Sequence, residues 1–166
     1  MTIRPVKASD IEDLYLMRTE NGVFENTLGY PSERITSTEE FVKNLPKHHH
    51  HFVAQVDGRV VGSLGIMVNL HPRRKHSASF GMSVREAYQG QGVGSALMEK
   101  MCDLCDNWIQ IHRIELGVYE DNIKAVNLYK KFGFVKEGVK VDAAFRNGKY
   151  VNEIIMARIR GGVTNE

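Results

Sequence analysis

The sequence contains few cysteines and no long apolar run, and both absences narrow the class of protein. Two of its 166 residues are cysteines, so there is no basis for a disulfide framework of the kind found in oxidising compartments. The clearest apolar run, Val60–Val68, is interrupted by glycine and serine and is far shorter than the roughly 20 residues that a membrane-spanning helix needs. The first residues, MTIRPVKASD, lack the apolar stretch of a secretion signal. We therefore expect a cytoplasmic protein with no membrane partner.

The chain also lacks a surplus of charge of one sign. It has 22 lysines and arginines against 20 aspartates and glutamates, a formal net charge of +2. A protein that binds nucleic acid through its phosphates needs a clear basic excess, so we expect no nucleic-acid partner. The composition, 42% hydrophobic and 25% charged, is that of a globular protein. No linker or repeat divides it, and we expect one domain over residues 1–166.

Neither the cysteines nor the histidines predict a metal site. Cys102 and Cys105 form a lone C-x-x-C within a helical pattern, whereas a structural zinc site needs two further ligands. The run His48–His51 leads into an extended segment. Neighbouring side chains of an extended chain point to opposite faces, so four in a row cannot converge on one ion. We expect no bound metal.

Hydrophobic periodicity predicts alternating strands and helices. Strands are expected at Thr2–Val6, Phe52–Val56, Arg59–Val68, Ala78–Val84, Arg113–Val118, Phe134–Ala143 and Tyr150–Ile159. Helices are expected after the capping boxes Ser9 with Glu12 and Ser37 with Glu40, from Val93 to Trp108, and over Asn122–Phe132. Two hairpin turns are expected, at Asp57-Gly58 and around Asn147-Gly148. The pattern predicts a mixed α/β fold with one continuous sheet.

A glycine-rich segment between a predicted strand and a predicted helix is the most informative part of the sequence. Its residues are Tyr88-Gln89-Gly90-Gln91-Gly92-Val93-Gly94-Ser95. Missing β-carbons let a ligand approach the backbone, and N–H groups at a helix N-terminus suit a phosphate or pyrophosphate. The alternative without a ligand is a tight turn that needs positive φ at one or two glycines. The segment lacks the lysine of a P-loop and does not complete G-x-G-x-x-G in either register.

Two motifs resemble those of the GNAT family of N-acetyltransferases. The family's acyl-CoA loop, Q/R-x-x-G-x-G/A, stands here as Gln89-Gly90-Gln91-Gly92-Val93-Gly94. The segment from Asn122 to Phe134 is similar to the family's N-x-x-A-x-x-L-Y-x-x-x-G-F. The resemblance covers about Phe52 to Ile159. Several shorter segments also look like a bacterial subfamily of amino-acid N-acyltransferases.

This resemblance implies a GNAT-like α/β fold with a mixed, mostly antiparallel central sheet and about four flanking helices. Two strands of that sheet would splay apart to form a cleft for acetyl-CoA, which is the co-substrate of the family. The residues implied for cofactor binding are Met82, Ser83, Val84, Gln89, Gly90, Gln91, Gly92, Val93, Gly94, Ser95, Asn122, Ala125 and Tyr129. Independently, Asn122, Ala125, Val126 and Tyr129 are spaced to share one helix face.

The resemblance also implies that Tyr129 is the catalytic residue, a general acid that protonates the departing CoA sulfur. The alternative is a tyrosine that packs against the sheet with its hydroxyl satisfied. The subfamily tends to carry an acid just before the Phe-Gly of the pantetheine strand, where this chain has Ser79. His76 and Glu120 are weaker candidates for a base, because a surface histidine and a capping glutamate are commoner.

We therefore expect an enzyme, an acetyl-CoA-dependent N-acetyltransferase that moves an acetyl group to a primary amine. A free amino acid or a related small molecule is the acceptor expected first. A protein or peptide amine acetyltransferase stays open, as does a non-catalytic acyl-CoA-binding sensor on the same fold. A nucleotide-binding oxidoreductase is a third alternative, but this chain lacks the dinucleotide-binding fingerprint of that class. A homodimer is expected from the resemblance alone.

Overall fold

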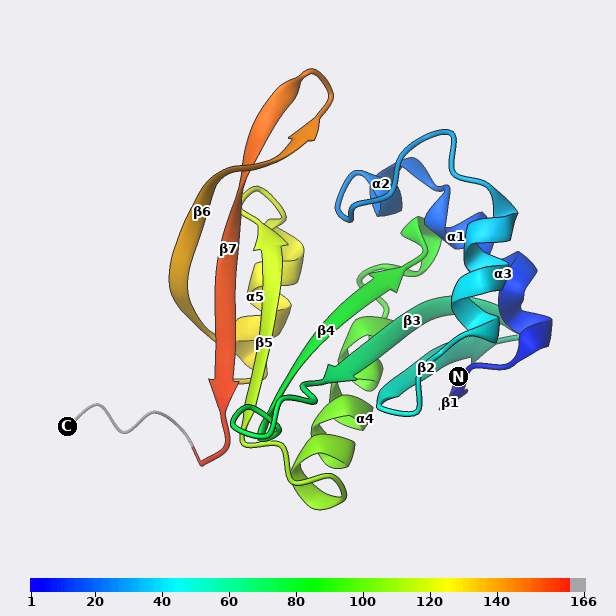
Figure 1. Cartoon of the computed structure of the whole chain (residues 1–166). Coiled ribbons are helices and arrows are strands. Elements are labelled where there is room, and N and C mark those ends of the chain that lie inside the picture. The colour runs from blue at the N-terminus through cyan, green and yellow to red at the C-terminus, as the bar shows by residue number, and fades with distance from the viewer. Residues whose placement is uncertain (162–166) are drawn as a thin grey trace. The chain divides into compact units, whose positions relative to one another are not determined.

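The chain forms a mixed, mostly antiparallel sheet with flanking helices. A computed structural model describes residues 1–161, and Figure 1 traces them from β1 to β7. Within these residues seven strands are hydrogen-bonded in the order β1-β2-β3-β4-β5-β7-β6. β4 and β5 pair in parallel, whereas β1–β2, β2–β3, β5–β7 and β6–β7 are antiparallel. The predicted fold class is confirmed, while the cleft between splayed strands stays a prediction.

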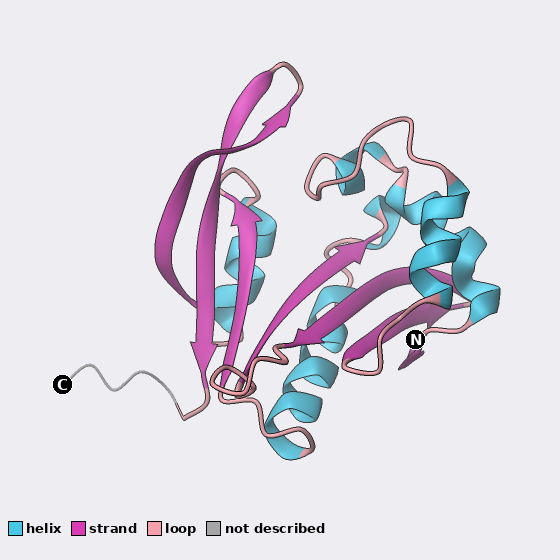
Figure 2. Cartoon of the chain, in the orientation of Figure 1, coloured by secondary structure: helices cyan, strands magenta, loops and turns pink. Residues whose placement is uncertain are grey.

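The secondary structure follows the sequence pattern closely (Figure 2). The strands are β1 (Thr2–Pro5), β2 (His49–Val56), β3 (Arg59–Val68), β4 (Ser77–Val84), β5 (Arg113–Tyr119), β6 (Val135–Arg146) and β7 (Lys149–Ile159). The helices are α1 (Ile11–Arg18), α2 (Asn21–Phe24), α3 (Ile35–Lys43), α4 (Val93–Asn107) and α5 (Ile123–Lys131), with single 3-10 turns η1 (Ala8–Asp10) and η2 (Glu86–Tyr88). The fifth helix, beyond the four or so expected, is the four-residue α2.

Both predicted capping boxes are wrong in detail. Helix α3 begins at Ile35, so Ser37 lies inside its first turn, and the capping position is Arg34. At the first helix the backbone N–H of Lys7 donates to Asp10 at 2.9 Å. The carboxylate of Asp10 is also held by Arg4 at 2.7 and 2.8 Å. Asp10 is the N-cap of α1 by position, but its side chain is bound by Arg4 and the N–H of Lys7 and makes no hydrogen bond to the first turn of α1.

The described chain contains two compact units. Unit 1 comprises Met1–Met67 and Gly81–Cys102, and unit 2 comprises Val68–Phe80 together with the chain from Asp103 onward. The expectation of one domain over residues 1–166 stays a prediction. No helix within residues 1–161 is both long enough and apolar enough to cross a membrane.

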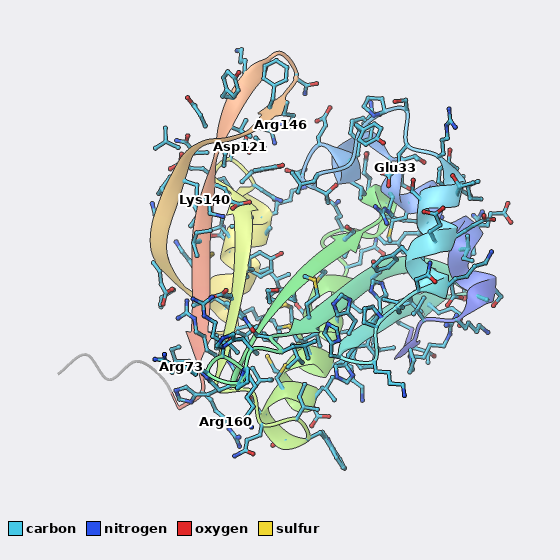
Figure 3. The ribbon with its side chains drawn as sticks, in the orientation of Figure 1. Glu33, Arg73, Asp121, Lys140, Arg146 and Arg160 are labelled. Carbon is cyan, nitrogen blue, oxygen red and sulfur yellow. The ribbon has the colours of Figure 1, made fainter. Side chains whose placement is uncertain are left out.

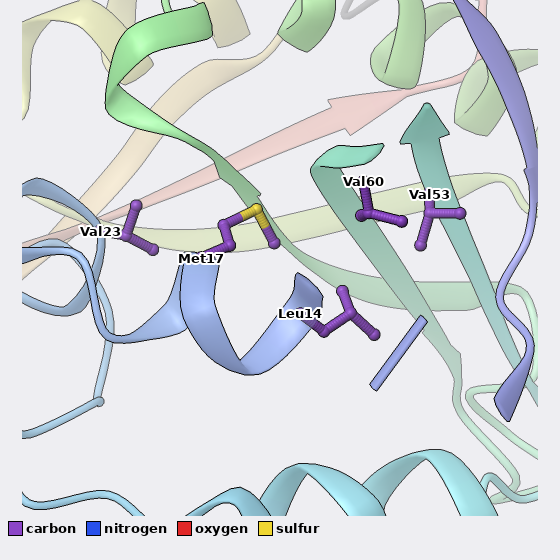
Figure 4. Close-up of a cluster of buried hydrophobic side chains, with 5 residues drawn as sticks. All are labelled: Leu14, Met17, Val23, Val53 and Val60. Carbon is purple, nitrogen blue, oxygen red and sulfur yellow. The ribbon is translucent and has the colours of Figure 1, made fainter. Parts of the chain in front are cut away.

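Unit 1 is built on the β2–β3 hairpin. Its turn, Asp57-Gly58, has φ of +48° and +81°, the left-handed pair that a tight two-residue hairpin requires. The apolar side chains beneath the hairpin and its helices form one cluster (Figure 4). Its members, each at most 4% exposed, are Leu14, Met17, Val23, Val53 and Val60. Their burial joins α1 and α2 to β2 and β3, and a hydrogen bond from the N–H of Val60 on β3 to Asp13 Oδ2 on α1, at 2.8 Å, adds a polar contact.

Unit 2 is built on β5. Its first residues pair in parallel with β4, through Ser77–Ser79 and Arg113–Glu115, and its whole length pairs with β7. Ala78 is the register partner of Ile114, so Phe80 shares the sheet face of Leu116 and Val118, two positions along each strand. That face is buried, and it is the face that α5 covers, because the ring of Phe80 contacts Tyr129.

Within unit 1, His51 is a half-buried histidine whose Nε2 atom is itself buried. Its ring meets the edge of Phe41 at a centroid distance of 5.2 Å, and Nε2 has no hydrogen-bond partner within residues 1–161. Burial, with smaller contributions from the charges of Arg18 and His49, lowers the pKa of His51 to about 4. The folded protein therefore holds a neutral imidazole where the unfolded chain titrates near 6.5.

This histidine predicts acid sensitivity. Its contribution to the free energy of unfolding is present above pH 6.5 and is lost as pH falls toward about 4, because the unfolded chain then binds a proton that the folded one resists. At about 1.4 kcal/mol per pKa unit the loss is at most about 3.5 kcal/mol. His51→Phe keeps a ring and removes the titration, so its urea-unfolding free energy falls less than that of the wild type between pH 7 and pH 4.5. Equal losses in the two proteins would contradict the prediction.

Candidate active site

The glycine-rich segment forms the turn from β4 into α4, within unit 1. Gly90 and Gly92 have φ of +73° and +86°, and a Cβ built on either would meet nothing within 4 Å. Two of the three glycines are therefore required by the turn itself. The third, Gly94, is the second residue of α4, so a turn alone does not account for it. The loop backbone is open to an approaching ligand at both turn glycines.

The first turn of α4 presents its N–H groups beyond this loop. The carbonyl of Gly92 accepts the N–H of Ala96 at 3.0 Å, so the N–H groups of Val93, Gly94 and Ser95 precede the first hydrogen bond within the helix. Together with the positive end of the helix dipole they suit an anion such as a pyrophosphate. The local geometry is thus consistent with the prediction that this segment suits a phosphate or pyrophosphate.

The start of α4 is fixed against β3. Val93 is buried, and a Cβ added at Gly62 of β3 would lie 2.9 Å from its Cγ1 and 3.1 Å from Leu97 Cδ1. A side chain at position 62 would therefore push the helix outward. Gly62 sets the depth at which the helix N-terminus stands, and through it the position of the loop.

The side chains of Gln89 and Gln91 brace the loop. Gln89 Nε2 donates to the carbonyl of Val84 at 3.1 Å, and Gln91 Nε2 donates to the carbonyl of Ala87 at 2.7 Å. Met82, Ser83 and Val84 are half-buried at the end of β4. The sequence predicts that both glutamines bind the cofactor. In the structure their side chains hold the main chain of the loop, and it is the main chain that is suited to binding a ligand.

A side chain not singled out from the sequence, Arg85, anchors the loop to the rest of unit 1. Its Nε donates to the carbonyl of Val60 at 3.1 Å, and Nη2 donates to the carbonyl of Asp13, also at 3.1 Å. Nη1 lies 3.4 Å from Glu20 Oε1. The second oxygen of Glu20 accepts the N–H of Glu86 at 3.0 Å. The only sequence signal for this anchoring role was the position of an arginine directly after a strand. The partners of Arg85 could not be predicted, because they are distant in sequence.

The second group of predicted residues lies on α5, in unit 2. Asn122 caps the helix, its Oδ1 accepting the N–H of Ala125 at 3.3 Å. Val126 and Tyr129 are buried, and Ala125 is half-buried. Ala125, Val126 and Tyr129 lie within α5 and Asn122 is its N-cap; a face shared by all four stays a prediction. The cap already uses the amide oxygen of Asn122, which leaves its Nδ2 as the group suited to a ligand carbonyl.

Tyr129 is held in an aromatic environment. It is 7% exposed, with ring centroids 5.6 Å from Phe80 and 6.1 Å from Phe134. Burial raises the pKa of Tyr129 to about 12. The phenol therefore keeps its proton throughout the physiological range, which is the state that a proton donor needs.

The two weaker candidates for a base lie at opposite ends of β5. His76 is exposed before β4, and its carbonyl accepts the N–H groups of His112 and Arg113. Glu120 is exposed after β5 and accepts from Asn152 Nδ2 at 3.1 Å. Among residues 1–161 no group of three or more histidine, cysteine, aspartate or glutamate side chains is arranged to hold a metal.

Comparison with known proteins gives the family. Residues 12–134 match the model of the Acetyltransferase (GNAT) family. The chain is 40% identical over 160 residues to the L-amino acid N-acetyltransferase AaaT of Escherichia coli K12, covering 96% of this chain and 98% of the relative. It is 27% identical to the spermidine N(1)-acetyltransferase of Vibrio cholerae, over 90% of this chain and 87% of that protein.

A solved structure agrees with these relatives. The spermidine N-acetyltransferase of Vibrio cholerae in complex with CoA and spermine superimposes with a TM-score of 0.83 at 26% identity, covering 95% of this chain and 94% of that one. Family match, relatives and fold concur. The chain belongs to the GNAT family of acetyltransferases and is an N-acyltransferase.

Proposed function

We propose that this enzyme transfers the acetyl group of acetyl-CoA to the amine of a free amino acid. The observation that carries the acceptor class is the similarity to the E. coli L-amino acid N-acetyltransferase, which extends over almost the whole of both chains. The similarity to spermidine acetyltransferases is lower, so a polyamine is the second candidate. A cytoplasmic location and a homodimer stay predictions from the sequence.

Acetyl-CoA is the co-substrate of GNAT acetyltransferases, and the residues present fit it. The open backbone at Gly90 and Gly92 and the N–H groups of the first turn of α4 suit its pyrophosphate. We assign to this the N–H groups from Gln91 to Ser95. Backbone groups of Met82 to Val84 would pair with the pantetheine amides as an added strand does. Asn122 and Ala125 would contact the pantetheine arm.

The transfer needs a nucleophile, a leaving group and one proton donor. The unprotonated amine nitrogen attacks the thioester carbonyl carbon, a C–N bond forms, and the C–S bond breaks. The attacking nitrogen gives up one proton to solvent, Tyr129 supplies one to the departing sulfur, and solvent returns a proton to the Tyr129 phenolate, so the products are an N-acetyl amine and the CoA thiol. A thiol has a pKa near 8.5, so this donation accelerates departure without being indispensable.

The test is acetyl-CoA-dependent release of free thiol across amino acids, polyamines, short peptides and amine antibiotics. Thiol release with amino acids alone supports the proposal. Thiol release with polyamines or peptides alone means that these, and not amino acids, are the acceptors. If acetyl-CoA raises the melting temperature but no acceptor gives thiol, the non-catalytic sensor is favoured. If acetyl-CoA neither shifts the melting temperature nor reacts, the proposal is wrong.

Tyr129→Phe tests the proton donor. We expect kcat to fall about 100-fold, the lower part of the range for general acids, because thiolate is a good leaving group. The Kd for acetyl-CoA stays within about twofold, since the ring and its packing remain. Steady-state kinetics and calorimetric titration measure the two. Equal turnover in both proteins would remove the acid role.

Gly92→Ala tests the loop. Alanine at φ +86° is strained by about 1–2 kcal/mol and shifts the N–H groups that we assign to the pyrophosphate, so the Kd for acetyl-CoA rises about tenfold. The matched control is Gly58→Ala, which has φ +81° and equally open surroundings but lies in the β2–β3 turn. Gly58→Ala lowers the free energy of unfolding by a similar amount and leaves the Kd for acetyl-CoA unchanged. Unchanged affinity in both variants would contradict the assignment.

A further inference from the structure

We propose that the carboxylate of Glu153 binds the ammonium group of the acceptor amine, and that the ammonium of Lys140 occupies this place until the acceptor arrives. The inference rests on the proposed function, because it names the group on this enzyme that receives the acceptor. It concerns unit 2 alone, and neither residue was predicted from the sequence.

Glu153 lies on the sheet face opposite α5. It is the register partner of Tyr119, as Ile155 is of Gly117, and partners in a ladder share a face. Leu116 and Val118 point to the α5 face, so Gly117 and Tyr119 belong to the other one. Gly117 is exposed, and the pairing of β5 with β4 ends at Glu115, so β5 is paired here with β7 alone and its backbone is open to solvent.

The carboxylate fills the space of a missing side chain. A Cβ built on Gly117 would lie 2.5 Å from Glu153 Cδ and 2.7 and 2.8 Å from its two oxygens. Glycine within a strand weakens it and often marks a close approach. Here the approaching group is a charged carboxylate lying flat on a central strand, and any other residue at position 117 would displace it.

Glu153 is shielded yet reachable. Its side chain is 25% exposed, and it stands beside the buried ring of Tyr119. The pKa of Tyr119 is raised, first by burial and then by the charge of Glu153. An ammonium that reaches this carboxylate is partly withdrawn from water. In such a partly shielded position the attraction between opposite charges is stronger than in bulk solvent.

An ammonium group already occupies the position. Lys140 Nζ lies 3.1 Å from Glu153 Oε1, and its side chain is 64% exposed. It extends from β6, where Figure 3 labels it, and the β6–β7 register becomes irregular directly after it. So exposed an ion pair contributes little to stability. A primary ammonium from solvent can therefore replace it at low cost.

The neighbouring carboxylates have firmer partners. Asp121 is bound by Arg146, whose guanidinium also stacks over the ring of Tyr119 at 5.3 Å. Glu120 accepts from the amide of Asn152. Both Arg146 and Asp121 are labelled in Figure 3, near the β6–β7 turn. Glu153 differs from these because its ionic partner is a mostly exposed lysine.

The test is a pair of variants with opposite effects on the KM of the acceptor. Glu153→Gln keeps the shape, removes the charge, and raises this KM about tenfold or more, as loss of a partner for a buried charge does. Lys140→Met removes the competitor and lowers the KM about two- to fivefold. Neither changes the Kd for acetyl-CoA. The controls are Glu115→Gln on the neighbouring strand β5 and Lys136→Met on β6, and both leave the KM unchanged.

Two further variants separate binding from folding. Gly117→Ala retains the charge but displaces the carboxylate, so it raises the KM as Glu153→Gln does. Glu153→Asp keeps the charge on a shorter side chain, so its KM for the acceptor lies between those of the wild type and Glu153→Gln. If the wild type transfers no acetyl group to any amine, the proposed function has failed. If it does, and Glu153→Gln keeps the wild-type KM, or Lys140→Met raises it, this inference is overturned while the proposed function stands.

Discussion

The position of the glycine-rich loop between β4 and α4 depends on the guanidinium of Arg85. It joins the end of β4 to the carbonyl of Val60 on β3 and to Asp13 on α1, and Glu20 continues the network to the backbone of η2. A guanidinium with only 14% of its side chain exposed is costly to bury unless its donors are satisfied. The partners and the loop are therefore fixed together, and the turn glycines then give the main chain its direction.

Much of the fold could be predicted because its signals are local. Asp57-Gly58 marks the first hairpin, and a change in hydrophobic period marks α4 and α5. Ser37 illustrates the limit, because its sequence fits a cap while the helix begins earlier. The partners of Arg85 and the carboxylate over Gly117 come from strands and helices far apart in the sequence. No spacing rule brings such residues together, so only the structure reveals them.

The groups that we propose to bind acetyl-CoA and those that we propose to bind the acceptor use different chemistry. The loop offers backbone N–H groups, braced by Gln89 and Gln91, and its shape is set by Gly90 and Gly92. The open face of β5 and β7 instead offers one side chain, Glu153, over a glycine. Main-chain recognition tolerates many sequences as long as the turn is kept. Side-chain recognition changes with a single substitution, which suits a family whose members share a cofactor and differ in acceptor.

The main-chain character of the loop has a consequence for how the enzyme responds to acidity. Peptide N–H groups neither gain nor lose protons near neutral pH, so a pyrophosphate held by them, as we propose, is bound with an affinity that does not change with pH in that range. The acceptor must shed a proton before it can react. If the proposed binding holds, acidification slows the transfer without releasing acetyl-CoA from the loop.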